Sequence, residues 1–162
     1  MAELLVRRLA GTDWAAFRAI RLAALRDAPE AFGSTAEDAE RVDEPEWRRR
    51  LRERAVFLAE VSTELVGLAA GIKGDMPGDA ELISMWVAPT WRGRGVGDRL
   101  VEAVLTWARQ EHFTAISLWV ASGNARAERL YARHGFAPTG RQQSMGGGKL
   151  DRLESEMRRQ IS

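Results

Sequence analysis

The stretch that decides the fold is V-A-P-T-W-R-G-R-G-V-G-D, residues 87–98. It joins an apolar run at 81–87, typical of a strand buried on both faces, to a segment at 95–111 with apolar residues at helical spacing. Glycines in such a turn let successive N–H groups approach a ligand, and the first N–H groups of a helix are unpaired and carry positive partial charge. The pattern therefore predicts a phosphate or pyrophosphate site, to which Arg92 and Arg94 add forked donors.

This glycine-rich loop does not match two common phosphate-binding loops. A P-loop needs G-x-x-x-x-G-K followed by Ser or Thr, and the chain has no such string. A dinucleotide fingerprint needs G-x-G-x-x-G, but Leu100 stands where the third glycine would follow Gly95 and Gly97. Taken alone, the stretch can also be an ordinary turn between a strand and a helix.

Hydrophobic periodicity predicts the elements on either side of this stretch. Strict alternation within 81–87 would place Glu81 and Val87 on one face of the strand and Trp86 on the other. The order β-α-α-β-β-β-α-β-α-β-β predicts an α/β (α+β) fold, a mixed sheet with helices on both faces, in a single domain over 1–162. The predicted strands are 4–9, 56–61, 65–72, 81–87, 115–120, 141–145 and 154–161, the last two around a GGGK loop, and the predicted helices are 14–26, 46–54, 95–111 and 124–134.

Composition excludes several classes of protein. The net charge of +1 argues against binding of nucleic acid over the whole surface. The chain has no cysteine, which excludes disulfides, thiolate metal sites and a cysteine acyl-enzyme. With only two histidines and no H-E-x-x-H, we expect no metal. No apolar run approaches the ~18 residues of a membrane helix, and the first residues lack a signal core, so we expect a cytoplasmic protein that binds no membrane.

Two motifs together resemble the GCN5-related N-acetyltransferase (GNAT) family. The string R-G-R-G-V-G at 92–97 is similar to that family's loop for the pyrophosphate of acetyl-CoA, Q/R-x-x-G-x-G/A. The string L-W-V-x3-N-x2-A-x3-Y-x3-G-F at 118–136 is similar to its second cofactor motif. The single asparagine, Asn124, and the single tyrosine, Tyr131, occupy that motif's two polar positions. The resemblance covers 56–136 and implies the GNAT fold, with a mixed, mostly antiparallel sheet of about seven strands.

The resemblance implies how acetyl-CoA would bind as the acetyl donor. The strands ending at Val87 and near Val120 would splay apart, and backbone groups of Met85 and Val87 would pair with the amides of the pantetheine arm. Asn124 would contact the arm from the other wall. The N–H groups of Arg92, Gly93, Arg94, Gly95, Val96, Gly97 and Asp98 would hold the pyrophosphate, and one or more of Arg126, Arg129 and Arg133 would either meet the 3′-phosphate or form a solvated face.

The same resemblance implies roles in acetyl transfer. Glu81 would take the proton from the amine, directly or through a water, although it also fits a surface residue that opens a strand. The backbone N–H of Val87 would stabilise charge on the thioester oxygen. The Tyr131 hydroxyl would give a proton to the departing thiolate, or Tyr131 is a core residue of its helix. Phe32, in the segment 29–34, is expected to line the acceptor pocket.

The leading hypothesis is an N-acetyltransferase that moves an acetyl group directly from acetyl-CoA to a primary amine in a ternary complex. The acceptor can be a small molecule or a protein, and the chain a monomer or a homodimer. One alternative is a non-catalytic module that binds acyl-CoA. Another is nucleic-acid binding by the arginines at 48–54, but flanking glutamates make a solvated helix face the better interpretation, so we expect no nucleic-acid partner.

Overall fold

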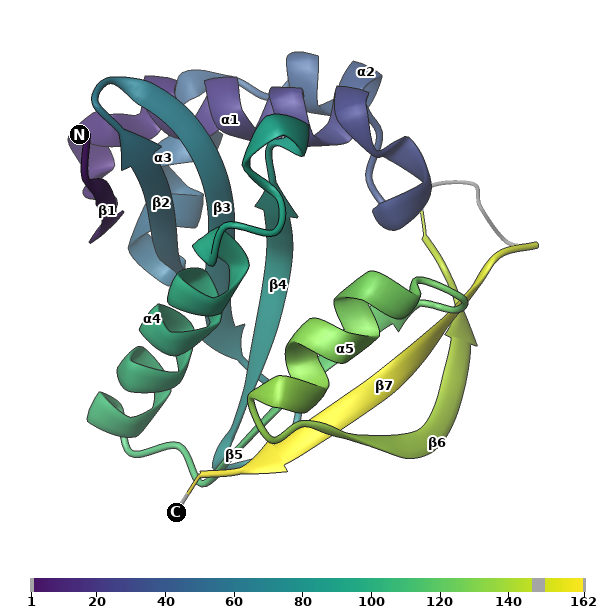
Figure 1. The fold of residues 1–162 in the computed structure, drawn as a ribbon. Helices are drawn as coiled ribbons and strands as arrows, with labels where there is room; N and C mark the ends of the chain where they lie inside the picture. The colour runs from purple at the N-terminus through teal and green to yellow at the C-terminus, as the bar shows by residue number, and fades with distance from the viewer. Residues whose placement is uncertain (1, 147–150, 162) are drawn as a thin grey trace.

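A seven-stranded sheet forms the centre of this computed structural model, which describes residues 2–146 and 151–161. The strand order is β1-β2-β3-β4-β5-β7-β6, and every neighbouring pair is antiparallel except β4 and β5 (Figure 1). The predicted α/β class, with a mixed and mostly antiparallel sheet, is confirmed. The strands are β1 (Leu4–Arg8), β2 (Ala55–Val61), β3 (Glu64–Lys73), β4 (Asp79–Val87), β5 (Ala115–Ala121), β6 (Ala137–Ser144) and β7 (Leu153–Gln160).

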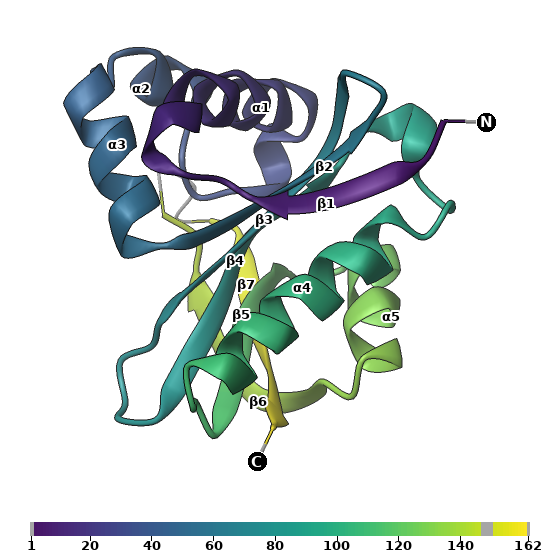
Figure 2. The same cartoon turned by 90° about the vertical axis from the view of Figure 1, so that its left-hand side faces the viewer.

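Helices cover both faces of the sheet, as predicted. Figure 2 shows α1, α2 and α3 on one side and α4 and α5 on the other. Buried side chains of α1 and α3, with Trp47 fully enclosed, form one core, and those of α4 form a second core with β2 to β5. The helices are α1 (Trp14–Asp27), α2 (Ala36–Glu40), α3 (Glu44–Glu53), α4 (Val96–Gln110) and α5 (Ala125–Arg133), with short 3-10 turns at Gly11–Asp13, Pro29–Ala31 and Pro89–Trp91.

Two glycines of β3 bring α4 unusually close to the sheet. A Cβ atom on Gly71 would lie 2.4 Å from Cζ3 of Trp107, and one on Gly67 would lie 2.9 Å from Cδ1 of Leu100. Because residues four apart in a strand share a face, both glycines lie under the same helix. The absence of side chains there lets α4 rest directly on β3.

A β-bulge interrupts β4 at Ser84. Ile83 pairs with Ala70 of β3 and Trp86 pairs with Leu68, so β4 has one more residue than β3 between these two pairs. Ser84 lies in this interval and has a φ of 61°. The extra residue inverts the alternation beyond it. Val87 therefore packs in the α4 core, whereas Ile83 and Trp86 pack in the α1 core.

The bulge overturns one expectation about β4. Glu81 shares the face of Ile83, two residues away, and so lies on the opposite face from Val87. The prediction that Glu81 and Val87 share a face is wrong, because it assumed an unbroken strand.

The two central strands diverge along most of their length. β4 pairs with β5 only where Asp79–Glu81 meets Ala115–Ser117. The remaining residues of β4 have no strand beside them on that side, which confirms the predicted splay. The described part of the chain therefore contains an open strand edge in the middle of the sheet.

Three smaller differences from the predicted elements have local causes. The sequence of α2, AEDAE, carries no apolar stripe, and Thr35 caps the helix by accepting from the N–H of Asp38. β6 begins at Ala137 instead of 141, because Pro138 is tolerated in an edge strand. The predicted GGGK loop at 146–149 lies, apart from Gly146, outside the described residues.

Candidate active site

A groove of about 810 Å³ occupies the gap between the diverging strands and is called here the β4–β5 groove. Its walls come from the tip of β4, the loop before α4, the end of β5 and the exposed side of α5. The structure brings most of the expected cofactor residues together in its lining: Met85, Val87, Arg92, Gly93, Gly95, Gly97, Asp98, Asn124, Arg126, Arg129 and Arg133. Arg94, Val96 and Tyr131 do not line it.

A row of unpaired N–H groups forms one end of the groove. Gly95 precedes the first turn of α4 with a φ of 83° and without a capping side chain. Within the described residues, the N–H groups from Gly93 to Asp98 donate to no backbone or side-chain acceptor. The N–H of Arg92 is different, since it donates to the carbonyl of Pro89 at 3.4 Å. The cradle of free donors therefore spans 93–98, one residue shorter than predicted, and has the polarity that binds an anion.

The Arg92 side chain does not present its forked donors to the groove as the sequence led us to expect. Its Nε donates to the carbonyl of Val87 at 3.0 Å, and its Nη2 donates to Asp27 at 2.8 Å. The same Asp27 oxygen accepts from the indole N–H of Trp86 at 2.9 Å. Arg92 thus ties the loop to the tip of β4 and to the end of α1. Arg94 stacks over Trp91, with its guanidinium carbon 4.8 Å from the ring centroid.

Asp98 connects the start of α4 to the end of α5. Its carboxylate accepts from Nε2 of His134 at 2.8 Å and from Nη2 of Arg133 at 3.2 Å. Partial burial raises the pKa of Asp98, but the hydrogen bonds from His134 and Arg133 outweigh this effect and leave the pKa below its usual value. These contacts fix the two walls of the groove relative to each other and occupy part of Arg133.

The backbone of Val87 faces the open side of β4. The N–H of Ala88 donates to the carbonyl of Val66 at 2.9 Å. Because N–H groups alternate in direction along a strand, the N–H of Val87 points away from β3 and toward the gap. The predicted donor for an acyl oxygen thus faces the groove.

The predicted polar residues of α5 have different surroundings. Asn124 caps the helix, its Oδ1 accepting from the N–H of Ala127 at 3.2 Å, so its Nδ2 is the group that remains for a ligand. Tyr131 is only 5% exposed and packs edge-on against Phe136. Burial raises the pKa of Tyr131 above its usual value. Among the described residues, no side chain or backbone group forms a hydrogen bond with its hydroxyl.

A second cavity, called here the Glu81 chamber, has a volume of about 1100 Å³ and lies on the sheet face opposite α4. Glu81, Ser117 and Trp119 line it from the sheet, and Phe32 lines both this chamber and the β4–β5 groove. Desolvation, followed by the charges of Asp75, Glu154 and Glu156, raises the pKa of Glu81. The expected base and the expected cofactor groove thus lie on two sides of β4.

A model described as the Acetyltransferase (GNAT) family matches residues 17–136. The chain belongs to the GNAT family. Solved members share its fold: an acetyltransferase from Streptococcus pneumoniae aligns with a TM-score of 0.81 and 22% identity, covering 99% of this chain and all of that one. The structure of yncA from Salmonella typhimurium, described with its cofactor acetyl-CoA, aligns with a TM-score of 0.76 and 23% identity over 99% of this chain and 95% of that one.

Curated relatives match parts of this GNAT chain. An uncharacterized N-acetyltransferase of Archaeoglobus fulgidus is 31% identical over 91 residues, which are 53% of this chain and 62% of the relative. Streptothricin acetyltransferase A of Bacillus subtilis is 30% identical over 83 residues, 51% of this chain and 47% of the relative. The chain therefore spans about half the length of the curated relatives it matches.

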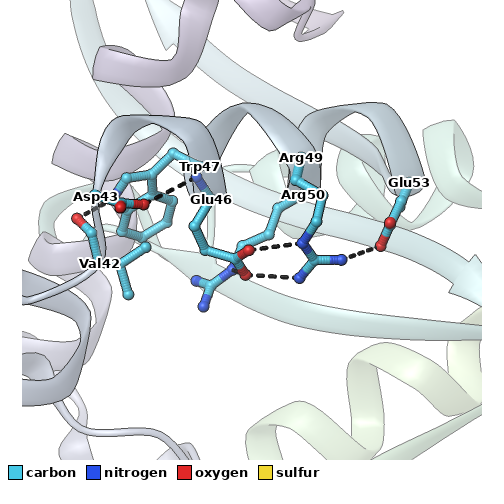
Figure 3. Close-up of polar contacts among 7 residues, drawn as sticks. All are labelled: Val42, Asp43, Glu46, Trp47, Arg49, Arg50 and Glu53. Atoms are coloured by element: carbon cyan, nitrogen blue, oxygen red, sulfur yellow. Dashed lines mark hydrogen bonds and ion pairs between the residues drawn. The ribbon is translucent and has the colours of Figure 1, made fainter.

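The arginine-rich α3 of this GNAT chain is largely paired within itself (Figure 3). Glu46 accepts from both Arg49 and Arg50, and Arg49 also donates to Glu53. This pairing supports the interpretation of the segment as a solvated helix face. Over residues 2–146 and 151–161 there is neither a cluster of side chains suited to a metal ion nor a helix long and apolar enough to span a membrane.

Proposed function

We propose that the chain is an N-acetyltransferase that transfers an acetyl group directly from acetyl-CoA to a primary amine. The observation that carries the proposal is the row of unpaired N–H groups at 93–98, located where a splayed strand leaves backbone groups free. Family membership and the acetyl-CoA described for the yncA structure support the same ligand.

The residues present fit acetyl-CoA. The cradle at 93–98 would hold the pyrophosphate, and the open edge of β4 at Met85 and Val87 would pair with the pantetheine amides. Nδ2 of Asn124 would contact the arm from α5, and Arg126 and Arg129 line the groove without a carboxylate partner in the described chain, as phosphate-binding side chains would. Acetyl-CoA supplies an acetyl group activated as a thioester. The rest of the chemistry belongs to the protein.

Glu81 is the proposed base. An alkylammonium has a pKa near 10.4, so almost all of it is protonated at neutral pH and must lose a proton before it can react. Because desolvation raises the pKa of Glu81, its carboxylate is a better proton acceptor than an ordinary glutamate. Its place in a separate chamber supports approach of the amine from the side opposite the α4 core.

Val87 and Tyr131 are the proposed groups on the other side of the reaction. The N–H of Val87 would donate to the acyl oxygen as that oxygen gains charge, which is worth on the order of 3 kcal/mol for one such donor. Tyr131 stays protonated because burial raises its pKa, and it would donate a hydrogen bond to the leaving sulfur.

The test combines binding with turnover on the purified protein. Calorimetric titration with acetyl-CoA measures binding, and release of free thiol in the presence of a panel of primary amines measures transfer. We expect both. Binding without turnover of any amine would favour the non-catalytic module, and no binding would overturn the placement of the cofactor.

A further inference from the structure

We propose that the acceptor is a small amine that also carries a carboxylate, and that Arg21 and Arg54 bind this carboxylate in the Glu81 chamber. Both arginines line the chamber together with Phe32. The inference rests on the proposed acetyl transfer and names the class of acceptor that this transfer would use.

Arg21 of α1 has no carboxylate partner within residues 2–146 and 151–161. Its Nη1 is the fully buried side-chain polar atom that lacks a hydrogen-bond partner in the described chain. The Phe32 ring packs against the guanidinium group, with the guanidinium carbon 4.8 Å from the ring centroid. Burial, with the nearby charges of Arg54 and Arg50, lowers the pKa of Arg21 to about 10. Buried charges are ordinarily paired, so this one points to a counter-ion that the described part of the chain does not supply.

Arg54, directly after α3, repeats the situation. Three other arginines of that helix have carboxylate partners, as Arg48 does with Glu44 at 2.9 Å. Arg54 has no ion pair or hydrogen bond to a described side chain. Burial, with the charges of Arg50 and Arg49, lowers its pKa, and the charges of Glu46 and Glu53 only partly oppose this. Two partly or largely buried arginines thus line one cavity, and neither has a carboxylate partner among the described residues. Guanidinium forks match a carboxylate in geometry as well as in charge.

The other lining residues of the chamber include five acidic side chains. Two of its five carboxylates pair with arginines, Asp79 with Arg158 at 2.6 Å and Glu156 with Arg141 at 3.3 Å. Glu81 has no cation beside it in the described chain. The chamber therefore offers unpaired positive charge at one place and an unpaired carboxylate at another. A molecule with an ammonium and a carboxylate satisfies both, whereas a plain amine leaves the arginines unpaired.

The test uses three single variants of the full chain. Arg21→Gln and Arg54→Gln each remove one proposed carboxylate ligand. Arg52→Gln is the matched control, because Arg52 is an exposed arginine of the same helix that does not line the chamber. Thermal denaturation without ligand shows whether each variant is folded, and titration with acetyl-CoA shows whether the β4–β5 groove is intact.

The acceptor panel consists of the common L-amino acids, the amide of each, and the corresponding amines without a carboxyl group. We expect the free acids to be the better acceptors. Arg21→Gln and Arg54→Gln should each lower kcat/KM for them by about 10- to 100-fold, which corresponds to the loss of one charged hydrogen bond. The loss should appear in KM, with kcat and the kcat/KM of the amides little changed. Arg52→Gln should behave as the unchanged protein.

Equal turnover of acids and amides, a preference for amines without a carboxyl group, or acetylation only of proteins would overturn the inference and leave acetyl transfer intact. A binding measurement separates the two proposals when no amine is turned over. If amino acids raise the melting temperature of the unchanged protein but not of Arg21→Gln, the carboxylate site stands and the proposed reaction fails. If no amino acid binds, the inference fails.

Discussion

Replacement of Gly95 by alanine tests the phosphate cradle most directly. Gly95 has a φ of 83°, and a Cβ atom built there meets no other atom within 4 Å. The change therefore introduces backbone strain without a clash. A non-glycine residue in the left-handed region costs about 1–2 kcal/mol, and each kcal/mol shifts the melting temperature of a chain this size by about 2–4 °C. We expect Gly95→Ala to melt about 2–8 °C lower.

The effect on binding should be larger than this strain implies. Gly95 lines the β4–β5 groove, so the new methyl group enters space beside the free N–H groups that would hold the pyrophosphate. A hydrogen bond to a charged group contributes about 1.5–3 kcal/mol. Loss of one such bond would weaken acetyl-CoA binding by about 10- to 100-fold. A bulkier residue at the same position is expected to abolish binding.

Gly140→Ala is the matched control. Gly140 has a φ of 90°, also has no atom within 4 Å of a built Cβ, and lies in β6 outside the groove lining. Its backbone strain should equal that of Gly95→Ala. The assay is calorimetric titration of all three proteins with acetyl-CoA, alongside their melting temperatures. The reasoning is refuted if Gly95→Ala retains the unchanged Kd, or if Gly140→Ala loses as much affinity.

Three further predictions concern side chains of the site. Because the pKa of Glu81 is raised, the kcat/KM of the unchanged protein should fall on the acidic side at a pH above the usual glutamate range. Glu81→Gln should lose this acidic limb in a pH–rate profile. An identical limb in the variant would exclude Glu81 as the base. Tyr131→Phe should lower kcat by about 100-fold while the Kd for acetyl-CoA stays constant, and parallel losses in titration and turnover would contradict its role. Asp98→Asn should lower the melting temperature at neutral pH. The pKa of Asp98 is lower in the folded than in the unfolded chain, so its contribution to stability is present above the unfolded-state pKa and is lost as the pH falls through the folded-state pKa. The melting temperatures of Asp98→Asn and the unchanged protein should therefore converge in acid.

The features that sequence predicted best depend on residues close together in the chain. The loop at 92–97 combines glycines with a following apolar stripe, and the predicted helix 95–111 is observed as Val96–Gln110. The splay of β4 and β5 came from the family resemblance and not from local pattern. The largest error in a strand boundary is at the start of β6, where Pro138 lies inside an edge strand.

The features that sequence missed depend on contacts between distant residues. Nothing in the letters around Ser84 marks a bulge, because a bulge is set by pairing with β3. Asp27, which holds both Trp86 and Arg92, is 65 residues from the arginine it pairs with. The sequence also could not predict that Arg21 lacks an acidic partner in the described chain, because α1 and the end of α3 come together only in the folded protein.

The single extra residue at Ser84 determines on which face of the sheet Glu81 lies relative to Val87. If the same residues paired without the bulge, Glu81 would share the face of Val87 and enter the apolar layer beneath α4. Deleting one residue at the bulge would instead restore plain alternation and keep the two on opposite faces. Loop exchange or grafting between relatives must therefore preserve the bulge together with the number of residues in the strand.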